Sequence, residues 1–129
     1  MGSAAVGRRD VTEMRILFCD DELPMLRVIQ VTLEPRGHTV EVAENARDAA
    51  DLFDSSIAGG QEYDLIVTDQ EMPGSSGFYL CGYVRASGYK GRLAVFTAFS
   101  PETANLADVQ AEYWPKPQAV GELVARVEG

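Results

Sequence analysis

The feature that most constrains the fold of this chain is a short run of apolar, largely β-branched residues, Leu65-Ile66-Val67. A carboxylate and a turn segment follow it closely in the sequence. Such a run is typical of a strand buried on both faces of a parallel sheet. Asp69 stands at the end of the run, and the following segment, residues 70–74, contains Pro73-Gly74 and favours a turn. A helical pattern opens after Gly77. Ligands of open α/β sheets bind beyond the carboxyl ends of the strands, so Asp69 is a candidate site residue.

Apolar strands and amphipathic helices alternate along the rest of the chain. Four further strands are predicted, over Arg15–Cys19, Thr39–Val42, Arg92–Thr97 and Glu112–Trp114. Helical patterns begin near Pro24, Ala46, Phe78, Pro101 and Val120. Alternation of this kind predicts parallel strands joined by right-handed crossovers. We therefore expect an α/β fold: a single-domain, flavodoxin-like three-layer sandwich with a five-stranded parallel sheet in the order 2-1-3-4-5 and five helices.

Length and composition narrow the class of protein. The 129 residues predict one domain, with a loose N-terminal segment over residues 1–13 and the folded domain over 14–129. The net charge of −9 argues against direct binding of nucleic acid or of an anionic membrane. The two cysteines, Cys19 and Cys81, are too few for a disulfide framework and indicate a cytoplasmic setting. No apolar run approaches the roughly 20 residues of a membrane span.

Polar residues stand where four of the predicted strands end. Asp20 and Asp21 follow the first strand, Asp69 the third, Thr97 ends the fourth, and Lys116 follows the fifth. Parallel strands end at one edge of the sheet, and in the order 2-1-3-4-5 the first and third strands are neighbours. The sequence therefore predicts that three carboxylates, a hydroxyl and a cation meet at this edge.

This set of residues has a definite chemistry. Clustered carboxylates repel one another unless a cation lies between them. Mg²⁺ commonly takes one or two carboxylates together with waters and phosphate oxygens, and a lysine is a point charge suited to phosphate. A carboxylate nucleophile, a metal, a lysine and a hydroxyl are the groups needed to hold a transferring phosphoryl group. Each residue by itself is also an ordinary cap, turn or strand residue, so the prediction depends on their joint placement.

Four short motifs carry a resemblance to a known family. They are Leu17-Phe18-Cys19-Asp20-Asp21-Glu22, Asp69-Gln70-Glu71-Met72-Pro73-Gly74 with Gly77, Thr97-Ala98, and Lys116-Pro117. In order and spacing, residues 15–128 resemble the receiver domain of two-component response regulators. The resemblance implies a signalling protein rather than an enzyme: Asp69 accepts a phosphoryl group from a histidine kinase or histidine phosphotransfer protein, and the chain catalyses only its own phosphorylation and slow autodephosphorylation.

The resemblance also assigns roles to individual residues. Asp21, the Asp69 carboxylate and the backbone carbonyl of Glu71 would bind Mg²⁺, or Mn²⁺, and Asp20 would act through metal-bound water. Thr97 and Lys116 would hold phosphoryl oxygens.

Further expectations concern the signal. The bond between Lys116 and Pro117 would be a cis peptide, and Tyr113 would reorient on activation. The face made by the fourth helix, fifth strand and fifth helix would then signal to a downstream protein or effector domain. Glu71 and Phe99, which flank the phosphorylation site in the family pattern, would set the lifetime of the phosphoryl group.

Some features depart from the family pattern or leave alternatives open. Gln110 stands where the family usually has a glycine, so we expect the turn before the fifth strand to be strained or rebuilt. An aspartate-nucleophile phosphohydrolase would want an Asp-x-Asp arrangement after the first strand, where Asp20 and Asp21 are adjacent here. A flavodoxin-like flavin binder would need a phosphate loop at the same place. A receiver that works by docking alone, without phosphate, is the third alternative.

Overall fold

The computed structural model describes residues 13–98 and 103–129 and contains a five-stranded parallel sheet. The strands are β1 (Arg15–Cys19), β2 (Thr39–Ala43), β3 (Leu65–Thr68), β4 (Arg92–Thr97) and β5 (Ala111–Pro115). Their order in the sheet is β2-β1-β3-β4-β5. The predicted fold class and strand order are confirmed.

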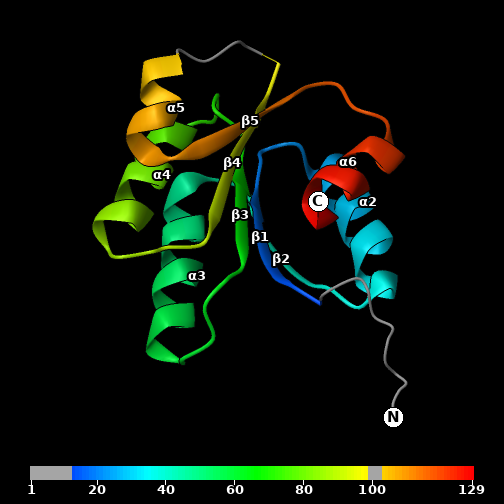
Figure 1. Cartoon of the computed structure of the whole chain (residues 1–129), viewed down its shortest axis with the longest axis horizontal. Coiled ribbons are helices and arrows are strands. Elements are labelled where there is room, and N and C mark those ends of the chain that lie inside the picture. The colour runs from blue at the N-terminus through cyan, green and yellow to red at the C-terminus, as the bar shows by residue number, and fades with distance from the viewer. Residues whose placement is uncertain (1–12, 99–102) are drawn as a thin grey trace.

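Helices cover both faces of the sheet (Figure 1). They are α2 (Leu23–Leu33), α3 (Ala46–Ala58), α4 (Gly77–Ala86), α5 (Thr103–Val109) and α6 (Val120–Glu128), with a short 3₁₀ helix, η2 (Glu34–Arg36), after α2. Figure 1 shows α3, α4 and α5 on one face and α2 and α6 on the other. The predicted start of the fourth helix, at residues 100–102, lies outside the described residues. Within the described ranges no helix combines the length and the apolar character needed to cross a membrane.

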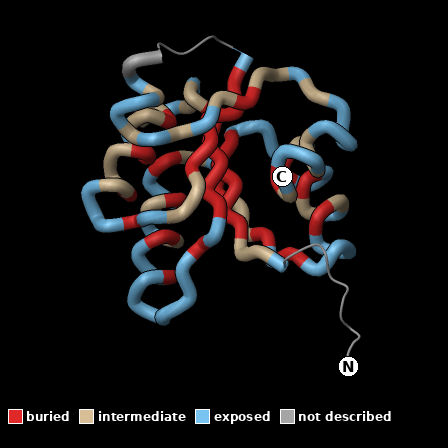
Figure 2. Tube along the Cα trace, viewed as in Figure 1, coloured by how far each residue is buried: buried red, intermediate tan, exposed pale blue. Residues whose placement is uncertain are grey.

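The sheet separates two apolar cores, because successive strand residues point to opposite faces. Leu17, Ile66 and Val95 belong to the core beneath α3 and α4, together with Phe53 and Leu80. The alternate strand residues build the second core, beneath α2 and α6. Its buried strand members are Ile16, Phe18, Val40, Leu65, Val67, Ala94, Phe96 and Trp114. Figure 2 shows the resulting band of buried residues through the centre of the molecule.

The end of α6 is held to the segment before β2 by Glu128. Arg36 donates two hydrogen bonds to the Glu128 carboxylate, both 2.6 Å long, and His38 Nε2 lies 2.8 Å from Glu128 Oε2. The His38 side chain is fully buried, and its Nδ1 accepts a hydrogen bond from the Met14 amide at 3.1 Å. The tautomer that fits both contacts has its ring hydrogen on Nε2, which donates a hydrogen bond to Glu128. Arg36 and His38 together lower the pKa of Glu128 from 4.5 to about 2.

This contact predicts a pH-dependent contribution to stability. A carboxyl whose pKa is lowered in the folded state stabilises the fold above its unfolded pKa and loses that contribution as the pH falls toward the folded pKa. The Glu128→Gln variant is therefore expected to be less stable than the wild type near neutral pH, with the deficit shrinking as the pH falls from about 4.5 toward 2. Urea unfolding of both proteins at about pH 6 and about pH 3 measures this difference.

The matched control for this experiment is Glu34→Gln, which removes an exposed carboxylate from η2. A deficit of Glu128→Gln that stays constant between the two pH values would contradict the assignment of the ion pair.

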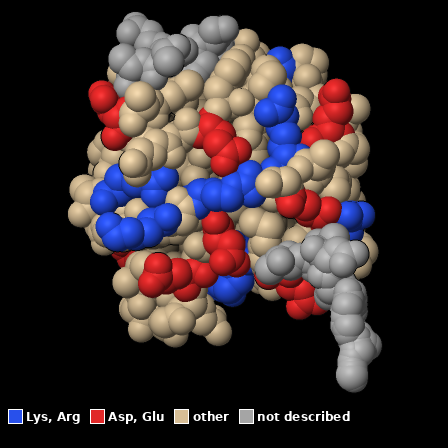
Figure 3. Space-filling model, in the orientation of Figure 1, with Lys and Arg blue, Asp and Glu red and all other residues tan. Residues whose placement is uncertain are grey.

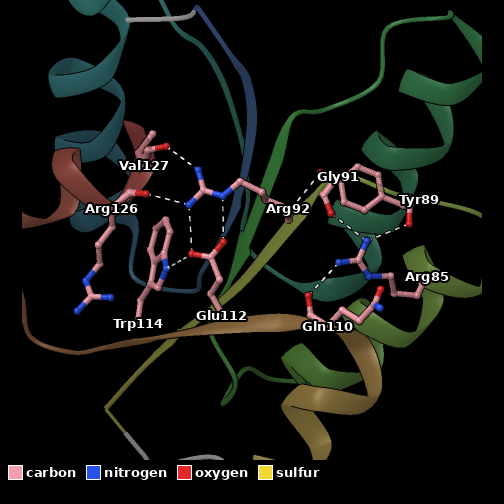
Figure 4. A network of polar contacts seen from close by, with 9 residues as sticks. All are labelled: Arg85, Tyr89, Gly91, Arg92, Gln110, Glu112, Trp114, Arg126 and Val127. Carbon is pink, nitrogen blue, oxygen red and sulfur yellow. Dashed lines mark hydrogen bonds and ion pairs between the residues drawn. The ribbon is translucent and has the colours of Figure 1, made fainter. Parts of the chain in front are cut away.

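Arg92, at the start of β4, joins three elements at the amino end of β5 (Figure 4). Its guanidinium donates to the backbone carbonyls of Arg126 and Val127 at 2.9 and 2.8 Å, at the carboxyl end of α6. It also forms two hydrogen bonds with the Glu112 carboxylate, at 2.9 and 3.1 Å, and Trp114 Nε1 donates to the same carboxylate at 3.0 Å. On the surface seen in the orientation of Figure 1, Lys and Arg side chains lie beside Asp and Glu side chains (Figure 3).

Arg85, near the end of α4, holds the turn before β5 (Figure 4). Gln110 in that turn has a φ of +54°, so the predicted departure from ordinary backbone geometry is confirmed. The Arg85 guanidinium donates to the carbonyls of Val109 and Gln110 at 2.8 and 3.0 Å. It also donates to those of Tyr89 and Gly91, at 3.0 and 2.9 Å. These hydrogen bonds stabilise the left-handed backbone conformation of Gln110, which is not a glycine.

Candidate functional site

Three carboxylates meet at the carboxyl ends of β1 and β3. One oxygen from each of Asp20, Asp21 and Asp69 lies within 4.8 Å of the others. The sheet brings them together because Cys19 and Thr68, the residues before Asp20 and Asp69, are paired across neighbouring strands. Asp20 and Asp69 are buried, with 1% and 8% of their surface exposed, whereas Asp21 is exposed. The arrangement is a candidate site for a hard divalent cation.

The electrostatics of the cluster favour such a cation. Burial raises the pKa of Asp20 above its usual range, and the hydrogen bond from Lys116 offsets that rise only in part. The ionised cluster is therefore short of positive charge, and a divalent cation would relieve the repulsion between its carboxylates.

Lys116 is the cation that the protein itself supplies. Its Nζ donates to Asp20 Oδ2 at 2.7 Å and to Glu22 Oε1 at 3.3 Å, and it lies 3.5 Å from Asp69 Oδ2. The same Nζ is 5.2 Å from the centroid of the Phe96 ring, within the range of a cation–π contact. Burial lowers the pKa of Lys116, but the three carboxylates outweigh that effect and raise it. Lys116 is therefore held as a charged group beside Asp69.

The Asp69 carboxylate and backbone are held by the adjoining chain. Asp69 Oδ1 accepts a hydrogen bond from the Gln70 amide at 2.7 Å, and the Asp69 amide donates to the Cys19 carbonyl at 2.8 Å. The first residue of α4, Gly77, approaches this backbone so closely that a Cβ there would lie 2.2 Å from the Asp69 carbonyl oxygen. The Gly77 amide donates to the Gln70 carbonyl at 3.1 Å. Only a residue without a side chain fits this contact.

The remaining predicted site residues occupy different positions. Thr97 is buried at the end of β4, and its carbonyl accepts a hydrogen bond from the Lys116 amide at 2.9 Å. Tyr113 is partly buried in β5, and Glu71 is exposed two residues after Asp69. The peptide bond between Lys116 and Pro117 is cis, as the resemblance implies. Phe99 lies outside the described residues.

Two contacts at the site were not among the sequence-based expectations. The pairing of Glu22 with Lys116 joins residues 94 positions apart, and its only sequence signal is that Glu22 directly follows Asp20 and Asp21. The contact between Lys116 and Phe96 crosses from the loop after β5 to the end of β4. Glu22 and Phe96 thus both contact the Lys116 ammonium group.

The strand order β2-β1-β3-β4-β5 is that of the flavodoxin-like α/β fold, to which CheY-like domains belong. The profile of the response regulator receiver domain matches residues 16–128, which is most of the chain. The chain belongs to the response regulator receiver domain family.

Individual response regulators are similar in sequence to this chain. The chain is 32% identical over 117 residues to the response regulator MprA of Mycolicibacterium vanbaalenii, covering 88% of this chain and 48% of MprA. It is 32% identical over 126 residues to the transcriptional regulatory protein TcrA of Mycobacterium tuberculosis, covering 95% of this chain and 47% of TcrA. The chain thus spans about half the length of the curated relatives it matches.

Solved structures show the same fold. The response regulator TrrA of Thermotoga maritima, solved in complex with Mg²⁺ and BeF, is 32% identical and superposes with a TM-score of 0.74 over 90% of this chain and 96% of TrrA. A CheY-like receiver domain protein of Methanospirillum hungatei is 21% identical, with a TM-score of 0.78 over 90% of this chain and 91% of that protein, which is a likeness of fold.

Proposed function

We propose that this receiver takes a phosphoryl group onto Asp69 from a histidine kinase or a histidine phosphotransfer protein, in a reaction that needs Mg²⁺. The observation that carries the proposal is the Asp69 carboxylate itself, which lies with Asp20 and Asp21 in one cluster and 3.5 Å from Lys116 Nζ. The proposal is also supported by the structure of TrrA, a protein 32% identical to this chain that was solved in complex with Mg²⁺ and BeF.

Each residue of the site has its own role in phosphoryl transfer. An Asp69 carboxylate oxygen attacks the phosphorus, and the phosphorus–nitrogen bond of the donor breaks, with its electron pair leaving on the imidazole. Lys116 neutralises charge on the phosphoryl oxygens, and the Thr97 hydroxyl donates a hydrogen bond to one of them. Asp21, Asp69 and the Glu71 carbonyl would hold Mg²⁺, with Asp20 acting through a bound water. The metal, when bound, supplies positive charge between the carboxylate and the phosphate.

The phosphoryl group would then change the face made by α5, β5 and α6. Phosphorylation adds about −1.5 to −2 charges at the end of β3. Thr97 moves toward the phosphoryl group and vacates space that Tyr113 occupies, so that the altered face binds a downstream protein or effector domain. Only contacts that differ between the two states can shift this equilibrium.

Two residues would tune the lifetime of the phosphoryl group. Hydrolysis needs a water in line with the bond that breaks. Phe99, which lies outside the described residues, is large and apolar, so it would shield the phosphorus without orienting a water. The Glu71 carboxylate would oppose charge on the phosphoryl oxygens. The resulting autodephosphorylation is slow, and it is the only reaction besides its own phosphorylation that the chain catalyses.

The proposal is tested by incubating the protein with Mg²⁺ and a small acyl phosphate. We expect the intact mass to rise by one phosphoryl group that is stable in acid and labile in base, and we expect a chelator of Mg²⁺ to prevent this. Amide chemical shifts of residues 103–113 should change at the same time. Continuous turnover of the donor without a retained group would instead indicate a phosphohydrolase, and an unmodified, folded protein would contradict the proposal.

A further inference from the structure

One carboxylate partner of Lys116 lies outside the cluster that can hold a cation. Lys116 Nζ contacts Asp20, Asp69 and Glu22, but only the first two belong, with Asp21, to the group of three carboxylates. The Glu22 side chain is 62% exposed, compared with 1% for Asp20. Glu22 is therefore the partner of Lys116 that is free to move and that a bound metal would not engage.

The backbone of Glu22 is held in place while its side chain stays available. Its amide donates to Asp20 Oδ1 at 2.9 Å, and its carbonyl accepts from the amides of Met25 and Leu26 at 3.1 and 3.2 Å. Glu22 is the N-cap residue of α2, where a short polar side chain usually accepts a hydrogen bond from the helix. The Glu22 side chain makes no such bond and reaches Lys116 instead.

The carboxylates that hold the Lys116 ammonium group would respond differently to a bound cation. A cation bound by the cluster draws on the charge of Asp20 and Asp69, which weakens their attraction for Lys116. Glu22 keeps its full charge for Lys116. A phosphoryl group on Asp69 needs the same ammonium group for its oxygens, so Glu22 and the phosphoryl oxygens compete for one cation.

We infer that Glu22 is a positioning residue that restrains Lys116 and thereby slows phosphorylation of Asp69. The inference rests on the proposed function. An exposed ion pair of this kind has a modest strength, so its removal is expected to change the rate of uptake by about two- to five-fold. Glu22→Gln should take up the phosphoryl group faster than the wild type.

The matched control is Glu44→Gln. Glu44 is exposed and directly follows β2, at the same edge of the sheet, because the carbonyl of its neighbour Ala43 accepts a hydrogen bond from the Asp20 amide at 3.0 Å. Among the described residues, the ion-pair partners of Lys116 are Asp20, Glu22 and Asp69, so Glu44→Gln removes an equal charge without touching Lys116.

A direct view of Lys116 completes the experiment. Lys90 and Lys116 are the only lysines in the sequence, so ¹⁵N-labelled lysine gives two side-chain ammonium signals. We expect Glu22→Gln to shift the Lys116 signal and to speed its hydrogen exchange with water, while the exposed Lys90 serves as an internal reference. Glu44→Gln should leave both signals unchanged. Thermal unfolding of the three proteins confirms that each is folded.

The outcomes separate the two proposals. An unchanged Lys116 signal in Glu22→Gln, or an uptake rate equal to that of Glu44→Gln, would overturn the role of Glu22 while phosphorylation of the wild type stands. Slower uptake by Glu22→Gln would overturn it as well. A wild type that takes up no phosphoryl group would overturn the proposed function itself and the competition with it.

Discussion

The Asp69→Asn variant is expected to gain no phosphoryl group from an acyl phosphate and Mg²⁺, a loss of more than about 10³-fold in rate, because a neutral amide is a poor nucleophile. The fold should persist, since an asparagine Oδ1 can still accept the hydrogen bond that the Gln70 amide donates at 2.7 Å. Intact mass after a fixed exposure to the donor measures the uptake.

The control for this loss is Asp51→Asn, which removes an exposed carboxylate from α3. It should take up one phosphoryl group at the wild-type rate. A single phosphoryl group gained by Asp69→Asn as fast as by the wild type would show that another residue is the acceptor.

The second large effect is expected for Gly77→Ala. The added methyl group would lie 2.2 Å from the Asp69 carbonyl oxygen and 3.0 Å from its carbonyl carbon, so the backbone of the site must move. Overpacking of this kind costs about 1–3 kcal/mol. The variant should unfold at a lower urea concentration, as followed by the fluorescence of the single tryptophan, Trp114, and should bind Mg²⁺ more weakly.

Gly82 in the same helix provides the comparison. Apart from its chain neighbours and the adjoining backbone of its own helix, a Cβ at Gly82 would have no atom within 4 Å, so Gly82→Ala should stabilise the protein by about 0.5–1 kcal/mol through helix propensity alone. Equal stabilities for Gly77→Ala and the wild type would show that the loop after β3 yields without cost and would contradict the close contact.

Much of the fold could be predicted from local patterns. The strand over Arg92–Thr97 has the predicted bounds. The helix predicted to begin near Ala46 is also observed, and Asn45 caps it, with its side chain accepting a hydrogen bond from the Asp48 amide at 2.8 Å. β5 extends one residue beyond its predicted bounds at each end, because pairing with β4 continues there. The apolar residues Leu26, Val28, Ile29 and Leu33 predict a single stripe along α2, but Val28 is 45% exposed and does not belong to it, because consecutive residues of a helix face different directions.

The candidate site, too, could be predicted only in part. The meeting of Asp20, Asp21 and Asp69 could be predicted, because parallel strands end at one edge. Contacts across long stretches of chain could not. The buried His38 pairs with Glu128, 90 residues away, and nothing local in either segment indicates the partner. Arginine binding to backbone carbonyls likewise leaves no pattern in the residues that accept the bonds.

The guanidinium groups of Arg85 and Arg92 bind six main-chain oxygens, and these contacts do not use the side chains of the residues that accept them. Two of the accepting residues, Gln110 and Arg126, are exposed, whereas Tyr89 and Val127 are buried. An exchange of Gln110 or Arg126 would therefore leave these hydrogen bonds in place. The surface before β5 and at the end of α6 can in this way change its chemistry at these two positions without a change in the frame beneath it.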